Sequence, residues 1–278
     1  TGWTRYRPHP AGAGHGAGAT LMRRGWLIAV LATLLAACAS PAQRAAENEK
    51  RDRAVDTQLQ LGAHYLVRGQ LDVARQHFER ALEIDPNSSP AMDRSALLYW
   101  RLRDYKQAET FFQRAIQIDA KNLAAHHNYG AFLCDRGRYD EGIRVLEKAA
   151  NNLLYPYVAD ANVNAGVCML RKPSYPLAEK YFREALRLDA DHSGALLQMA
   201  HIYHRRGDML RARAFIQRYF KPGARLDTPE SLLLAYRIET ALRDHNAAAS
   251  YALRLRNRFP EAAEVQRLHA KPSPRRKN

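Results

Sequence analysis

The chain has 278 residues, of which 43 are basic and 28 are acidic, so its formal net charge at pH 7 is +15. Such a balance favours anionic partners, but the basic residues are scattered along the chain and no nucleic-acid-binding motif occurs, so we expect no nucleic-acid partner. The sequence also lacks a glycine-rich phosphate loop, a nucleophile elbow and a zinc-protease helix. We therefore expect neither enzymatic activity nor a cofactor.

The first predicted element in chain order is an export signal. Residues 22–37 contain two arginines followed by a short apolar run, which is typical of a secretory signal peptide and too short to span a membrane. The run ends in Leu-Ala-Ala directly before Cys38 and resembles the lipobox of bacterial lipoproteins, in which the cysteine is lipidated. An ordinary signal peptide with an incidental cysteine is the alternative. We expect residues 1–21, which precede Met22, to be a non-native extension.

Lipidation at Cys38 would anchor the mature chain to a membrane. Two or more acyl chains give a stable anchor, because each buried CH₂ contributes about 0.8 kcal/mol. Lipoproteins retained at the inner membrane usually carry aspartate after the cysteine, whereas Ala39 and Ser40 follow here, so the resemblance implies the periplasmic face of the outer membrane. Residues 38–55 are mostly polar and are predicted to form the lipidated tether. Loss of residues 1–37 removes four arginines and no acidic residue, which leaves a net charge of +11.

Six copies of a helical-hairpin repeat are predicted over residues 56–268. Each copy has a small residue in its first helix and another twelve positions later in its second helix. Successive copies are 34 residues apart, with two extra residues between the third and fourth copies and one before the sixth. This is the period of the tetratricopeptide repeat, in which stacked hairpins build a shared core. We therefore predict an all-α, right-handed solenoid of about six repeats. The small-residue pairs are Gly62/Ala74, Ala96/Ala108, Gly130/Gly142, Gly166/Ala178, Ala200/Ala212 and Ala235/Ala247.

Turn residues predict where the helices end. Pro86 follows the second helix of the first copy, and proline cannot continue a preceding helix. Three copies have a glycine between their first and second helices, where the turn favours a left-handed backbone conformation. These glycines are Gly69, Gly137 and Gly207.

Two further segments are predicted beside the regular repeats. Asn151–Val158, which is rich in leucine and tyrosine around a proline, is interpreted as a bent helix end that shifts the stacking between the third and fourth copies. Residues 261–268 are predicted to form a last helix that caps the stack, and residues 269–278 a disordered basic tail.

Cys134 and Cys168 lie in the first helices of adjacent copies, at different repeat positions. An oxidising compartment such as the periplasm permits disulfides. Bridged Cα atoms, however, must lie within about 7 Å of each other, which neighbouring first helices rarely allow. We therefore expect two buried thiols.

His201 and His204 are three residues apart on one predicted helix, a spacing that could hold a metal ion. No third ligand of suitable type stands at a compelling position. We therefore interpret them as groove or surface histidines and expect no metal site.

The first helices of such a solenoid line its concave side, and their inward-facing positions in the first two copies are apolar. Exposed apolar surface marks binding sites, and tryptophan is enriched among the residues that dominate binding energy. Alternatively, Trp100 and Leu66 only pack between repeats. Amide side chains in later copies could bind the backbone of a guest polypeptide. The predicted protein-binding groove consists of Leu59, Ala63, Leu66, Val67, Leu97, Trp100, Asn128 and Asn164.

The lipobox, the six repeats and three short stretches together resemble the type IV pilus biogenesis/stability lipoprotein family, the pilotins of the pilus secretin. The resemblance covers about residues 22–268. The three stretches are Leu154-Tyr155-Pro156, Asn164-Ala165-Gly166-Val167-Cys168 and Asn257-Arg258-Phe259-Pro260.

The resemblance implies an acylated, for example palmitoylated, outer-membrane lipoprotein. Such a protein binds secretin subunits and promotes their outer-membrane localisation and multimerisation, on which pilus assembly and twitching motility depend. It also implies an apolar secretin-binding groove near the first repeat, which agrees with the interpretation of Leu59, Leu66 and Trp100. The alternatives are an envelope lipoprotein that scaffolds cell-wall enzymes and a cytoplasmic regulator whose apolar run is a false signal.

Overall fold

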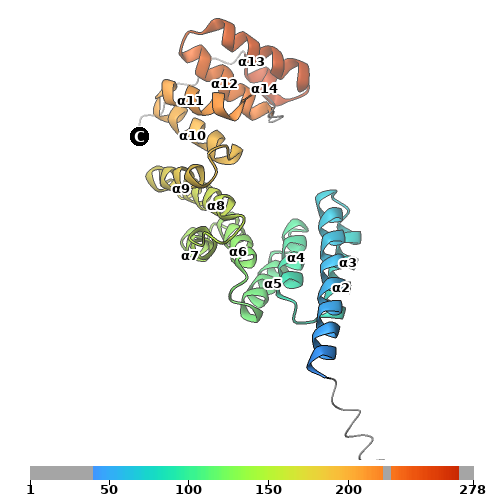
Figure 1. Cartoon of the computed structure of the whole chain (residues 1–278). Helices are drawn as coiled ribbons and strands as arrows, with labels where there is room; N and C mark the ends of the chain where they lie inside the picture. The colour runs from blue at the N-terminus through green and yellow to red at the C-terminus, as the bar shows by residue number, and fades with distance from the viewer. Residues whose placement is uncertain (1–39, 222–226, 269–278) are drawn as a thin grey trace, which may run out of the picture. The chain divides into compact units, whose positions relative to one another are not determined.

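The fold is a series of helical hairpins. The computed structural model describes residues 40–221 and 227–268, and every regular element in those two ranges is an α-helix (Figure 1). The chain divides into two units at a boundary between Ala54 and Val55, which lies within the first described helix, and the hairpins from Val55 onward belong to the second unit. The helices are α2 (Pro41–Val67), α3 (Leu71–Ile84), α4 (Ser89–Arg101), α5 (Tyr105–Ile118), α6 (Leu123–Asp135), α7 (Tyr139–Ala150), α8 (Val158–Arg171), α9 (Tyr175–Leu188), α10 (Ser193–Arg206), α11 (Met209–Tyr219), α12 (Pro229–Ala241), α13 (His245–Arg258) and α14 (Ala263–Arg267).

Helices α2 to α13 form the six predicted hairpins, from α2–α3 to α12–α13. The first helices of neighbouring hairpins also touch, as α4 does with α6, α6 with α8, and α10 with α12. The last predicted helix is present as α14. Its neighbours are α12 and α13, so it covers the final hairpin as expected.

Small residues allow the two helices of each hairpin to approach closely. A Cβ atom added to Gly62 or Gly166 would overlap the ring of Phe78 or Phe182. In the third hairpin both helices contribute a glycine, and a Cβ atom on Gly130 would lie 2.8 Å from the carbonyl oxygen of Gly142. The regular small residues of the first five hairpins are therefore points of contact between helices, whereas in α13 the buried alanine is Ala248 and the prediction of Ala247 is wrong by one position.

We expect Gly130→Ala to lower the free energy of unfolding by about 1–3 kcal/mol, because overpacking at a tight contact forces the backbone to shift. The added Cβ would lie 2.6 Å from Cγ of Leu146 as well as against backbone. Urea unfolding monitored by circular dichroism measures the loss.

Gly194→Ala is the matched control, because a Cβ atom there meets no atom closer than 3.3 Å. It should change stability much less than Gly130→Ala does, because its nearest neighbour is the side chain of His192 at 3.3 Å rather than backbone. Equal effects of the two substitutions would show that space at Gly130 is not limiting.

The turn chemistry is confirmed. Helix α3 ends at Ile84, two residues before Pro86. The three predicted turn glycines, Gly69, Gly137 and Gly207, have φ values of 75°, 79° and 82°.

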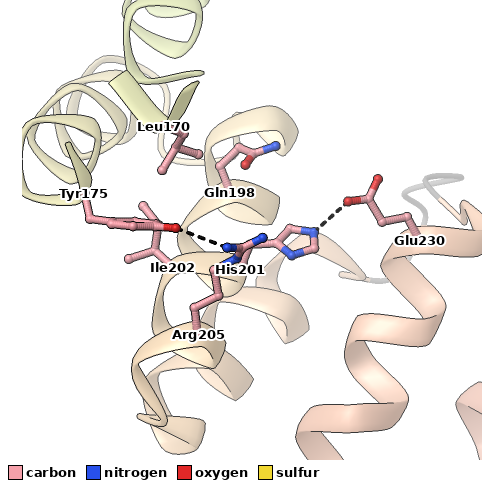
Figure 2. A pocket seen from close by; sticks show the side chains of 7 residues that line it. All are labelled: Leu170, Tyr175, Gln198, His201, Ile202, Arg205 and Glu230. Atoms are coloured by element: carbon pink, nitrogen blue, oxygen red, sulfur yellow. Dashed lines mark hydrogen bonds and ion pairs between the residues drawn. The ribbon is translucent and has the colours of Figure 1, made fainter. Parts of the chain in front are cut away.

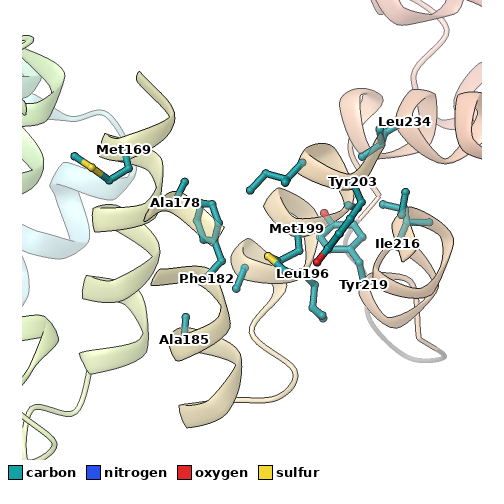
Figure 3. Close-up of a cluster of buried hydrophobic side chains, with 14 of the residues drawn as sticks. Met169, Ala178, Phe182, Ala185, Leu196, Met199, Tyr203, Ile216, Tyr219 and Leu234 are labelled. Carbon is teal, nitrogen blue, oxygen red and sulfur yellow. The ribbon is translucent and has the colours of Figure 1, made fainter. Parts of the chain in front are cut away.

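A hydrophobic core continues from one hairpin to the next. Figure 3 shows part of it, where Phe182 of α9, Met199 and Tyr203 of α10 and Ile216 of α11 lie in one buried cluster. Each of these side chains is fully buried. Because each hairpin supplies only part of this core, neighbouring hairpins stabilise one another.

The segment between α7 and α8 differs from the prediction. The bent helix end predicted for Asn151–Val158 is wrong, because α7 ends at Ala150 and residues 151–157 form turns. Tyr155 is buried and its hydroxyl lies 3.1 Å from Nδ1 of His127. The proline and the buried tyrosine thus favour an anchored loop over a continued helix.

The prediction of two free thiols is also wrong, because Cys134 and Cys168 form a disulfide between α6 and α8. Their Cα atoms lie 5.4 Å apart, within the range that a disulfide requires. Gly142 on the neighbouring helix makes room for the sulfur, since a Cβ atom there would lie 2.5 Å from Sγ of Cys134. The prediction was wrong because it assumed that neighbouring first helices rarely approach closely enough for a disulfide, whereas α6 and α8 are in direct contact.

The predicted signal peptide, Cys38 and the basic tail lie outside the described residues. The predicted tether is helical from Pro41 onward, as the first part of α2. Among the described helices, none combines the length and apolar character needed to cross a membrane.

Candidate protein-binding groove

The predicted groove residues of the first hairpin lie on the last turns of α2. Leu59 is buried in a cluster with Phe78, and Leu66 packs partly buried against the same cluster. Ala63 is half-buried. Val67 is 79% exposed, so it is the most accessible apolar side chain of the predicted groove in this hairpin.

Trp100 lies between the second and third hairpins. Its indole is half-buried, and its ring centroid lies 5.6 Å from that of Phe132 on α6. Its Nε1 donates to Oδ2 of Asp135 at 3.1 Å. Leu97, one turn earlier on α4, packs against the same cluster. Trp100 therefore has a packing role between repeats while part of its surface stays accessible.

The two predicted groove amides bind partners within the chain. Asn128 donates from Nδ2 to both carboxylate oxygens of Asp93, at 3.0 and 2.9 Å. Nδ2 of Asn164 lies 2.6 Å from Nε2 of His127. The structure thus places Asn128 and Asn164 in a polar network that joins α4, α6 and α8, apart from the apolar side chains of α2.

Burial dominates the electrostatics of this network. Asp93 is only 2% exposed, and burial raises the pKa of its carboxyl to about 6 even though Asn128 and Arg94 favour the charged form. Burial also lowers the pKa of His127 and raises that of Tyr155 to about 12. The sequence interpretation missed Asp93, although the 34-residue period places it at the position equivalent to His127 in the next repeat.

A second group of polar side chains lines a pocket of about 220 Å³ beside α10 (Figure 2). Nη1 of Arg205 donates to the hydroxyl of Tyr175 at 3.1 Å. Nε2 of His201 lies 3.0 Å from a carboxylate oxygen of Glu230 on α12. Burial lowers the pKa of His201, which keeps the imidazole neutral near pH 7. Gln198 completes this polar lining.

The described residues contain no group of three or more histidine, cysteine or acidic side chains placed to hold a metal ion. The acidic group next to His201 is the carboxylate of Glu230, 3.0 Å from Nε2.

Comparison with known proteins identifies the repeat and the family. Tetratricopeptide repeat families match residues 53–121, 99–153, 133–193 and 174–225. The type IV pilus assembly protein PilF of Pseudomonas aeruginosa is 31% identical over 249 residues, which cover 89% of this chain and 98% of PilF.

Solved structures of type IV pilus proteins are also similar to this chain. A structure of Pseudomonas aeruginosa PilF aligns with a TM-score of 0.69 and 32% identity, over 78% of this chain and 97% of that one. A crystal structure of PilW, a widely conserved type IV pilus biogenesis factor, aligns with a TM-score of 0.68 and 27% identity, over 78% of this chain and 98% of that one. The predicted tetratricopeptide solenoid is thereby confirmed, and the chain belongs to the family of type IV pilus assembly proteins that includes PilF and PilW.

Proposed function

We propose that this protein is a lipid-anchored outer-membrane pilotin, which binds secretin subunits and promotes their localisation and multimerisation in type IV pilus biogenesis. The similarity to PilF over 98% of PilF's length carries this proposal, because it extends beyond the repeats that many unrelated scaffolds share. Repeat solenoids act by presenting an extended surface to other polypeptides. The proposed role is accordingly one of binding, without catalysis.

Two observations support export and anchoring. The apolar run before Cys38 has the form of a lipoprotein signal. Disulfides persist mainly in oxidising compartments such as the periplasm, and α6 and α8 are joined by one.

A deletion strain tests the proposed function. Outer-membrane fractions of the strain should lose heat-resistant secretin multimers, and the wild-type gene should restore them. A Cys38→Ser gene should fail to restore them at the outer membrane and should lose labelling by radioactive palmitate. Normal multimers together with altered cell shape would reject the pilotin role and favour the scaffold for cell-wall enzymes.

We expect Val67→Asp to weaken binding of purified secretin subunits by about tenfold or more, because a charge would have to be desolvated in an apolar contact. Val67 is largely exposed, so the fold should tolerate the change, whereas Leu66→Asp should weaken binding and also cost stability. Surface plasmon resonance measures the affinity, and a circular-dichroism melt measures folding.

Leu210→Asp is the matched control, because Leu210 is 69% exposed but lies on α11, outside the predicted groove. It should bind like the wild type. Equal loss in the Val67 and Leu210 variants would show that added negative charge, rather than the groove, accounts for the effect.

A further inference from the structure

The pocket beside α10 is lined by residues of the fourth to sixth hairpins, whereas the apolar part of the predicted secretin groove lies in the first two. It has an apolar floor, formed in part by Leu170 and Ile202, and a polar rim (Figure 2). Its volume of about 220 Å³ suits one side-chain head group or chain end rather than a whole folded element. A pocket of this size on a repeat surface can fix the position of one residue of a bound polypeptide.

Arg205 gives the pocket a cation that pairs with no acidic side chain among the described residues. Within the described ranges its hydrogen-bond partner is the hydroxyl of Tyr175, at 3.1 Å, and no carboxylate lies within ion-pair distance. The adjacent Arg206 differs, because it forms an ion pair with Glu179. A guanidinium paired with a phenol retains most of its capacity to bind a carboxylate.

Glu230 shows that a carboxylate fits against the other side of the pocket. One of its oxygens lies 3.0 Å from Nε2 of His201, whose side chain is 25% exposed. The Glu230 side chain itself is 69% exposed, so it can return to solvent at little cost. Nε2 of His201 is buried and its hydrogen-bonding capacity is unsatisfied within the described residues, although the Glu230 carboxylate lies close to it. A better-placed carboxylate can therefore replace that of Glu230.

We propose that this pocket binds a carboxylate group of a partner polypeptide, in competition with Glu230. Arg205 pairs with the incoming carboxylate, Nε2 of His201 donates a hydrogen bond to it, and the Gln198 amide binds a neighbouring peptide group. A cationic guest is disfavoured, because Arg205 lies at the same rim and Glu230 is the one carboxylate among the lining residues. The site is independent of the secretin groove and does not require the secretin to be the partner.

The test uses the full-length protein in detergent and follows the imidazole ¹³Cε1–¹H resonance of His201, assigned with His201→Gln. The probes are acetyl-Gly-Glu-Gly-amide, its glutamine and lysine analogues, and acetyl-Gly-Gly-Leu with a free carboxylate. We expect the glutamate peptide, the free-carboxylate peptide, or both, to shift the resonance saturably, and the glutamine analogue to bind at least about tenfold more weakly. Whichever carboxylate peptide binds identifies an acidic side chain or a chain terminus as the source.

Two variants give effects of opposite sign. Arg205→Gln should weaken binding of the carboxylate peptide by about tenfold, with Arg205→Lys intermediate, whereas Glu230→Gln should strengthen it several-fold by removing the competitor. Glu230 is exposed, so this second variant keeps the test decisive if Arg205→Gln melts early. Equal binding of the glutamate and glutamine peptides, preference for the lysine peptide, loss of binding in Glu230→Gln, or no saturable shift with any probe would overturn the proposal. None of these outcomes bears on secretin multimers, so failure here is distinct from failure of the pilotin role.

Discussion

Replacing both Cys134 and Cys168 with alanine is expected to lower the free energy of unfolding by roughly 4 kcal/mol. The bond links residues 34 positions apart, and the entropy lost by closing a loop of that length in the unfolded chain corresponds to about this value. The closed loop contains α7 and the turn segment 151–157, which is the longest connection between adjacent hairpins in residues 40–221. The disulfide therefore stabilises the solenoid at the place where its period is interrupted.

Urea unfolding of the wild type and the double alanine variant, each with and without dithiothreitol, measures this contribution. Reduction should shift the wild type towards the variant and leave the variant unchanged. Alanine replacement also removes the buried sulfur atoms, so the reduced wild type isolates the cross-link from the packing. A reduced wild type as stable as the oxidised protein would contradict the entropic estimate.

The sequence predicted the hairpins well because their determinants are local and repeated. A small residue recurs at the same position of both helices in the first five hairpins, and Gly130 and Gly142 show why, since neither site can hold a side chain without moving its neighbour. In α13 the buried alanine is Ala248, one position after the predicted Ala247. Turn positions such as Pro86 follow equally local backbone rules. These features need no knowledge of how one hairpin stacks on the next.

The polar contacts escaped prediction because they depend on that stacking. Asn128 and Asn164 were expected to serve a guest, but their partners Asp93 and His127 come from the preceding repeat, 35 and 37 residues away. The prediction of free thiols at Cys134 and Cys168 was wrong for the same reason, because the distance between their Cα atoms depends on how α6 packs against α8. The proposed carboxylate pocket likewise needs Glu230 of the sixth hairpin beside His201 of the fifth. A repeat period predicts which positions are equivalent in successive repeats. It does not predict which side chains at those positions are in contact.

The polar network between α4 and α6 leads to a prediction about pH. Asp93→Asn should raise the free energy of unfolding at pH 7 by up to about 3 kcal/mol, because the wild type must keep a buried carboxylate ionised with one amide as its hydrogen-bond partner. The neutral asparagine can still accept a hydrogen bond from Asn128. The gain should appear even though the substitution removes one charge-assisted hydrogen bond, since burial is the largest influence on the Asp93 pKa.

The sign of the pH dependence follows from the pKa of Asp93, which is raised from 3.8 to about 6 in the folded protein. Between these values the folded state holds the proton more tightly than the unfolded state, so wild-type stability falls as the pH rises from about 4 to about 6 and this contribution is constant above that. The carboxyl of Glu179 has its pKa lowered to about 2, because hydrogen bonds from Tyr203, Arg183 and Arg206 outweigh the opposing effect of burial. The contribution of Glu179 to stability changes at lower pH and in the opposite direction. Both proteins contain Glu179, so its contribution cancels in the difference between their stabilities.

Urea unfolding of the wild type and Asp93→Asn at pH 4, 5, 6 and 7 gives that difference directly. It should be near its minimum at pH 4, grow between pH 4 and 6, and level off by pH 7. Asp56→Asn, at an exposed site of α2, is the control and should shift stability by less than about 0.5 kcal/mol at every pH. A difference between the wild type and Asp93→Asn that does not vary with pH would mean that Asp93 titrates alike in the folded and unfolded chains, and that the burial of its carboxylate between α4 and α6 is compensated by the network around it.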